Sequence, residues 1–131
     1  MMNRREFLAT SAALAALPQA EERIGIWDNH CHLGGIPGKT ATERIEKLLA
    51  IADRVGVEHL SLHLGMVTGV EDPTTEQLTA DNNTVLEAVK VAGRRAHGYV
   101  YLNPNHLDFS LQEFDRCVRD GPMVGVKLWV A

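Results

Sequence analysis

The sequence has no cluster of lysine and arginine side chains, and its 131 residues carry a net charge of −4. Nucleic acids bind to concentrated positive charge, so we do not expect one as the main partner. No nucleotide-binding loop is predicted, because the glycines of "GGIPGKT" have the spacing of neither G-x-G-x-x-G nor G-x-x-x-x-G-K. No apolar run after residue 20 is long enough to cross a membrane, which favours one soluble domain.

Cysteine is scarce, with only Cys31 and Cys117 in the chain. An oxidising compartment would allow the two to pair, but a sequence cannot place their Cα atoms within bridging distance. The alternation of a strand directs Cys31 away from the polar residues on either side of it. We therefore interpret Cys31 as a small buried side chain rather than as a disulfide partner.

The first 20 residues, "MMNRREFLATSAALAALPQA", differ from the rest of the chain. An arginine pair, a short apolar segment and a small residue at the end are typical of a secretory signal of the bacterial twin-arginine type. The alternative is an ordinary N-terminal helix, but residues 8–17 lack the polar face that such a helix would show to water. We predict a twin-arginine-like signal peptide at 1–20 and an exported protein, periplasmic or extracellular.

Short apolar runs alternate with helical patterns along the rest of the chain. Strands are predicted at 24–29, 57–64, 96–103 and 123–130, and helices at 40–56, 74–93 and 108–121. The N-cap candidates are Thr40 or Thr42 for the first helix and Asp108 or Ser110 for the last. The middle helix contains "DNN", so it is either one bent helix or a loop followed by a helix. This β-α alternation predicts a parallel sheet with right-handed crossovers.

The strand faces favour a barrel over an open sheet. In the second run, Leu60, Leu62 and Leu64 share one face, while the other face carries histidine and serine. An aliphatic face suits an outer layer of helices, and a polar face suits the interior of a catalytic barrel. A complete barrel needs about 250 residues. We therefore predict an α/β fold in which residues 21–131 form the N-terminal half of a metal-dependent (β/α)8 TIM barrel, with about four βα units.

The first strand carries the candidate metal site. In "DNHCH", Asp28, His30 and His32 alternate, so we expect all three on one strand face, followed by two glycines. Two imidazoles at this spacing suit one Zn²⁺ or a similar ion, and Asp28 could orient a ligand. Taken alone, H-x-H is a weak signal that favours two hydrogen-bonded histidines in a polar loop over a metal site. Two imidazoles without further ligands would hold a divalent ion only weakly.

The wider pattern resembles the amidohydrolase superfamily, and within it the amidohydrolase-related group that includes decarboxylases. The resemblance covers residues 24–131 and depends on D-x-H-x-H in the first strand, "GVKL" in the fourth and Asn103-Pro104. It implies that His30 and His32 bind one divalent metal, with Zn²⁺ the expected ion. It also implies that the remaining metal ligands, a fifth-strand histidine and an eighth-strand aspartate that also serves as acid/base, would follow residue 131. Lys127 matches the lysine of the family's fourth strand, whereas Trp129 stands where the family often has a histidine.

Three further residues are candidates for substrate contact: His63, Lys127 and Trp129. His63 is as easily interpreted as a hydrogen-bonded interior histidine, Lys127 as one partner of an interior ion pair, and Trp129 as a core residue. The leading functional hypothesis is a hydrolase in which metal-activated water attacks an amide, ester or lactone carbon of a small molecule. The alternatives are a metal-dependent decarboxylase on the same scaffold and an inactive truncated fragment.

Overall fold

The computed structural model describes residues 24–64 and 72–128. The predicted signal peptide and Trp129 lie outside the described residues. Four strands alternate with helices: β1 (Ile26–His32), α2 (Ala41–Val55), β2 (Val57–His63), α3 (Thr75–Ala92), β3 (Ala96–Leu102), α4 (Leu107–Phe114) and β4 (Gly125–Leu128). Short 3₁₀ turns precede β3 (Gly93–Arg95) and α4 (Pro104–His106), and a π-helical turn (Asp115–Arg119) follows α4.

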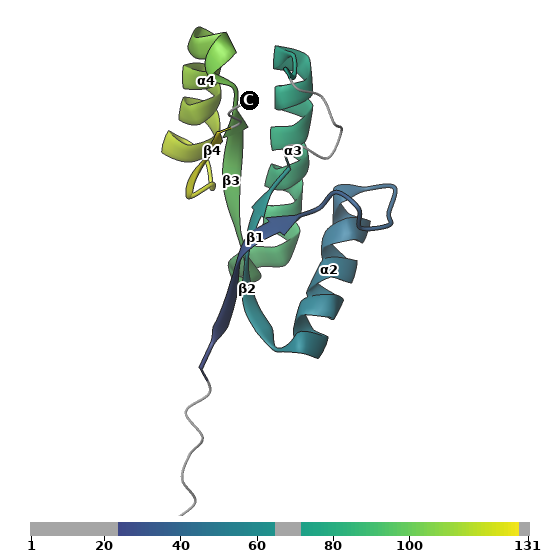
Figure 1. Ribbon diagram of the computed structural model, residues 1–131. Coiled ribbons are helices and arrows are strands. Elements are labelled where there is room, and N and C mark those ends of the chain that lie inside the picture. The colour runs from purple at the N-terminus through teal and green to yellow at the C-terminus, as the bar shows by residue number, and fades with distance from the viewer. Residues whose placement is uncertain (1–23, 65–71, 129–131) are drawn as a thin grey trace, which may run out of the picture.

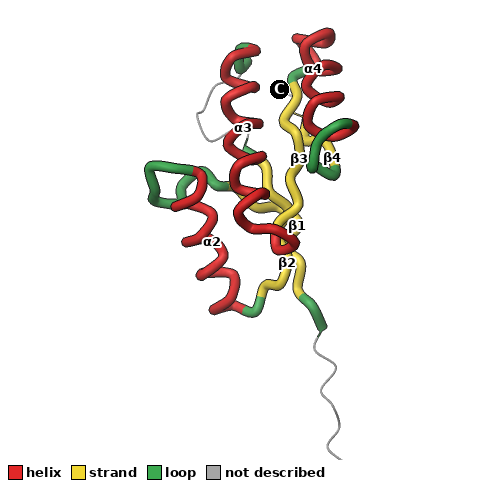
Figure 2. Tube along the Cα trace, turned by 180° about the vertical axis from the view of Figure 1, so that it is seen from behind, coloured by secondary structure: helices red, strands yellow, loops and turns green. Residues whose placement is uncertain are grey.

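The strands form one parallel sheet in the order β1-β2-β3-β4. The sheet curls, with α2 and α3 on one side of the strands and α4 beside β3 and β4 (Figures 1 and 2). This arrangement confirms the parallel α/β prediction and is compatible with part of a TIM barrel. The strands are staggered: β3 pairs with β2 at Ala96–Gly98 and with β4 at Tyr99–Leu102.

Local sequence signals place the ends of α2 and α3. Thr40 caps α2 by accepting a hydrogen bond from the Glu43 main chain, and Gly56 ends it at φ 77°, a left-handed conformation that favours glycine. Thr74 and Gln77 form a reciprocal capping box at the start of α3. The segment left open as a bent helix or a loop is one continuous helix, because Asn82 lies in the buried interior of the protein.

The start of α4 differs from the prediction. Neither Asp108 nor Ser110 caps it; Asn103 instead accepts a hydrogen bond from the Asn105 main chain and caps the preceding 3₁₀ turn. The Ser110 hydroxyl is buried and donates to the Asn103 carbonyl. The sequence pattern therefore located the helix but not its first turn, because Pro104 begins a 3₁₀ turn that α4 continues.

The apolar core lies between the sheet and the helices. Leu60, Leu62 and Leu64 are at most 7% exposed and pack with residues of α2 and α3, which confirms the predicted faces of β2. The outer face of β4 is different, because Val126 is 39% and Leu128 50% exposed. Leu128 lines an apolar hollow with Leu111 and Phe114 of α4, so that helix covers this face of β4 only in part.

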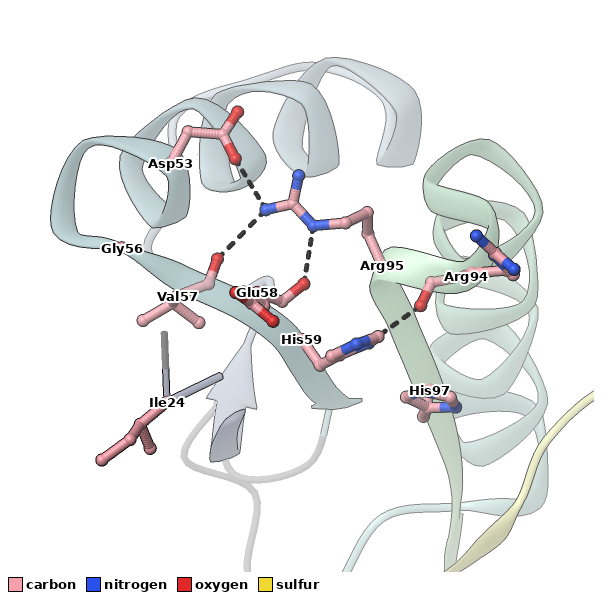
Figure 3. A pocket seen from close by; sticks show the side chains of 9 residues that line it. All are labelled: Ile24, Asp53, Gly56, Val57, Glu58, His59, Arg94, Arg95 and His97. Atoms are coloured by element: carbon pink, nitrogen blue, oxygen red, sulfur yellow. Dashed lines mark hydrogen bonds and ion pairs between the residues drawn. The ribbon is translucent and has the colours of Figure 1, made fainter. Parts of the chain in front are cut away.

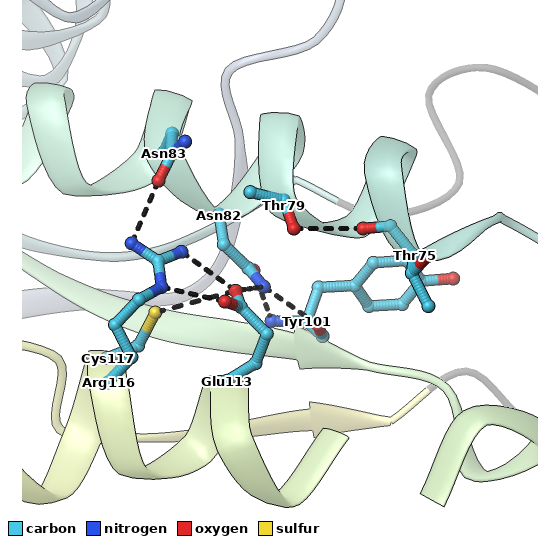
Figure 4. Close-up of polar contacts among 8 residues, drawn as sticks. All are labelled: Thr75, Thr79, Asn82, Asn83, Tyr101, Glu113, Arg116 and Cys117. Atoms are coloured by element: carbon cyan, nitrogen blue, oxygen red, sulfur yellow. Dashed lines mark hydrogen bonds and ion pairs between the residues drawn. The ribbon is translucent and has the colours of Figure 1, made fainter. Parts of the chain in front are cut away.

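A buried polar cluster joins α3, β3 and α4 (Figure 4). The Asn82 amide donates to the Tyr101 carbonyl at 3.1 Å and accepts from the Tyr101 main-chain N–H at 2.8 Å. It also donates to the Glu113 carboxylate, which Arg116 holds through two hydrogen bonds. The Asn82 side chain thus pairs with β3 as a neighbouring strand would. It does so at Tyr101, beyond Gly98, where the pairing of β2 with β3 ends.

Candidate metal centre

Three histidines meet where β1 and β2 end. The two strands are parallel, so their carboxyl ends lie at the same edge of the sheet, and His32 pairs directly with His63. His30 and His32 come from β1 and His63 comes from β2. The structure therefore brings together the two ligands predicted from spacing and one residue that the sequence left undecided.

The three imidazoles are close enough to bind one metal ion. Each offers a nitrogen, and these three nitrogens lie within 4.8 Å of one another. The Nε2 atoms of His30 and His32 are 3.0 Å apart. The His63 ring lies nearly perpendicular to both, with its centroid 4.8 Å from that of His30 and 4.1 Å from that of His32. No carboxylate belongs to this group in the described part of the chain.

Burial keeps two of these rings neutral. His63 is only 4% exposed. Burial lowers the pKa of His63 to about 4, with smaller electrostatic contributions from His32, Lys127 and His30. Burial also lowers the pKa of His32. Neutral imidazole is the form that binds a metal, so both rings are in the ligand state at neutral pH.

The cluster fits a divalent metal by its donor chemistry. Neutral imidazole nitrogens are ordinary ligands of Zn²⁺ and similar borderline ions. The Nδ1 atoms of His32 and His63 are buried and have no hydrogen-bond partner among the described residues. An unpaired buried polar atom costs roughly 1–3 kcal/mol. A metal ion could satisfy such a nitrogen, which the described residues leave without a partner.

Asp28 does not share the face of the histidines as expected. From Asp28 to Cys31 the register of β1 advances by three residues while β2 advances by two, so β1 contains a bulge. The Asp28 carboxylate accepts a hydrogen bond from the His30 main chain at 3.0 Å and contacts the Cys31 thiol. Asp28 therefore contacts the main chain of His30 and the thiol of Cys31 rather than an imidazole ring.

The bulge brings Asn29 and His30 to the same side of the sheet. The Asn29 side chain accepts from the Ser61 hydroxyl, and Ser61 in turn accepts from the indole N–H of Trp27. The Trp27 ring also contacts His59 and His97, at centroid distances of 5.2 and 4.9 Å. A layer of polar and aromatic side chains therefore lies below the histidine cluster. Spacing alone did not reveal it, because its members come from three strands.

Lys127 contributes positive charge at the cluster. It lies on β4, and its charge helps to lower the pKa values of His32 and His63. None of the ion pairs among the described residues includes Lys127, so the interior ion pair considered from the sequence is not formed there. A cation beside neutral imidazoles favours the approach of an anionic or strongly polarised ligand.

A hollow lies at the end of the strands opposite the histidine cluster (Figure 3). It has a volume of about 1270 Å³ and is lined by residues at the start of β2 and β3. Arg95 is engaged with its neighbours: it binds the Asp53 carboxylate at 2.7 Å and the Glu58 main-chain carbonyl at 2.6 Å. The His59 Nδ1 atom is 3.0 Å from the Arg94 carbonyl. These contacts hold α2, β2 and β3 together and leave the histidine cluster as the stronger candidate site.

Comparisons with protein-family models, with curated proteins and with solved structures found no match to this chain. None of the described helices is long and apolar enough to cross a membrane.

Proposed function

We propose that the protein containing this chain is a metal-dependent hydrolase of the amidohydrolase-related type. The observation that carries the proposal is the group of three histidines at the carboxyl ends of parallel strands. In barrels of this class the catalytic residues project from those strand ends. The D-x-H-x-H sequence of β1 and the curled parallel sheet support the same proposal.

His30 and His32 would hold the metal, with Zn²⁺ the expected ion. A bound divalent ion supplies a Lewis acid that activates water and polarises a carbonyl group. Burial favours the neutral, metal-binding form of His32 and His63. Lys127 adds positive charge that would attract and orient the carbonyl or carboxylate of a small-molecule substrate.

Metal analysis combined with substrate profiling tests the proposal. We expect about one divalent ion per full-length protein, and its loss in His30→Ala and His32→Ala. Hydrolysis of at least one substrate in a panel of amides, esters and lactones should disappear in the same variants. His97→Ala is the matched control, because His97 lies on β3 in the layer below the cluster and should leave the metal in place.

Two results would contradict the proposal. Full metal occupancy in the His30→Ala, His32→Ala double variant would end the assignment of the ligands. Release of CO₂ from carboxylic acids without hydrolysis of any panel member would assign the site to a decarboxylase instead. The panel should therefore include aromatic and enol acids, and CO₂ should be measured with each.

A further inference from the structure

We infer that His63 is a third protein ligand of the same ion, so that β1 and β2 together form a three-histidine metal centre. This inference rests on the proposed function and assigns a residue of its site. Register is the first observation: His63 pairs with His32 across the parallel strands, which places both side chains at one height. His30 lies two residues before His32 on the same strand.

The distances suit a shared ion after small side-chain rotations. With metal–nitrogen bonds near 2.0–2.1 Å, ligand nitrogens of a tetrahedral site are about 3.3 Å apart. The His30 and His32 Nε2 atoms are 3.0 Å apart, and all three ligand nitrogens fall within 4.8 Å. The His63 ring is inclined at 74° to His30 and 78° to His32, so it is not stacked on either.

His59 on the same strand shows what a structural histidine looks like in this protein. Its Nδ1 lies 3.0 Å from the Arg94 carbonyl, which accepts the ring N–H and fixes the orientation of the ring. His63 is more deeply buried than His59, yet its Nδ1 has no partner among the described residues. Buried polar groups normally have partners, so the unpaired Nδ1 atom of His63 points to a ligand that the described residues do not provide.

All three ligands of the inferred centre are imidazoles. An ion held by imidazoles alone keeps its full double charge, and the group contains no carboxylate in the part of the chain that the structure describes. His63 would add a third imidazole to the pair on β1 and so increase the affinity for the ion.

Cobalt binding provides the test. Co²⁺ is titrated into the full-length apoprotein, with the dissociation constant and the visible d–d absorption measured for wild type, His63→Ala and His63→Phe. The phenylalanine variant keeps a ring in the buried space while removing both nitrogens. We expect both variants to weaken Co²⁺ binding at least tenfold and to change the absorption spectrum. His59→Ala, on the same strand and face, should bind within about twofold of wild type.

Wild-type protein gives a second measurement in case neither variant folds. Nitrogen-15 spectra of the histidine rings should show the resonances of His30, His32 and His63 shifting when Zn²⁺ is added, while His59 stays unchanged. Wild-type affinity and spectrum in both His63 variants, or an unshifted His63 ring, would overturn the inference. The proposed function would survive that result if His30→Ala and His32→Ala still lose the metal, and it would fail with the inference if wild type binds none.

Discussion

The two cysteine thiols are both buried, but in different surroundings. Cys31 is 7% exposed between the two β1 histidines, and Cys117 is fully buried under the helices. Both are free thiols, so the structure agrees with the interpretation of Cys31 as a buried side chain rather than a disulfide partner. Burial, more than any neighbouring charge, raises the pKa of Cys117 to about 11.

Cys117 should be nearly inert in the folded protein. With a pKa of about 11, roughly one thiol in a thousand is ionised at pH 8, and only the thiolate reacts. In a Cys31→Ala variant, we expect the reaction of Cys117 with a disulfide reagent to be at least 100-fold slower in buffer than in denaturant. The absorbance of the released thiol measures both rates. Equal rates in the two solutions would mean that Cys117 is accessible.

Single residues of the site were predictable to different degrees. The H-x-H spacing was enough to select His30 and His32, because both lie on one side of the bulge. His63 could not be assigned from sequence, since its contact with β1 depends on the register between two strands. Asp28 was expected on the face of the histidines, and the bulge that moves it away has no signal in the residue pattern.

At the scale of elements, α3 is attached to β3 by the Asn82 side chain. Asn82 is fully buried and satisfies both main-chain groups of Tyr101. Asn82→Leu would leave these buried groups unpaired, and we expect a loss of about 2 to 3 kcal/mol in the free energy of unfolding. Lys90→Ala, on the exposed side of the same helix, should cost less than about 0.5 kcal/mol. Denaturant titration of both variants checks the difference, and equal losses would show that the Tyr101 contacts contribute little.

Glu113 makes this cluster sensitive to pH. Burial alone would raise the pKa of Glu113, but the Arg116 guanidinium and the Asn82 amide outweigh it, and the pKa is lowered overall. A carboxyl group with a lowered pKa stabilises the fold above its unfolded pKa, near 4.3, and loses that contribution as pH falls through the folded value. Glu113→Gln should therefore destabilise the protein at pH 7, and the difference from wild type should shrink below about pH 4.

Urea titrations of wild type and Glu113→Gln at a series of pH values measure this effect. Glu46→Gln is the control, because Glu46 is exposed on α2. A difference between wild type and Glu113→Gln that stays constant down to pH 3 would contradict the assigned role.

The elements themselves followed from local signals more reliably than the site did. Helix α2 has its predicted cap at Thr40 and its predicted end at Gly56. The uncertainty over α3 arose because "DNN" is unfavourable in a helix by propensity, and the pairing of buried Asn82 with Tyr101 overrides that preference. Long-range contacts of this kind have no local signature, so only the structure reveals them.

At the scale of the whole molecule, the sheet has two open edges. Within residues 24–64 and 72–128, β1 and β4 each pair with a single strand. Apolar side chains are exposed along both: Ile26 is 50%, Trp27 53% and Leu128 50% exposed. Unpaired strands with apolar side chains promote association with other chains.

The 131-residue chain should therefore self-associate. We expect its weight-average mass in sedimentation experiments to rise with concentration, and Leu128→Lys to reduce that rise by placing a charge at the exposed edge. Val91→Lys is the control, because Val91 is 43% exposed on α3, away from both edges. A chain that stays monomeric at every concentration would refute this prediction.

The bulge in β1 shifts the in-and-out alternation of the strand by one residue. Before it, odd-numbered Trp27 faces the inside of the curl; after it, even-numbered His30 and His32 do. The aromatic layer and the histidine cluster therefore use odd-numbered and even-numbered positions of the same strand, respectively. Deleting Asn29 would restore a single alternation and still leave Trp27 and both histidines inside. In a regular strand, a one-residue deletion turns every following side chain to the opposite face.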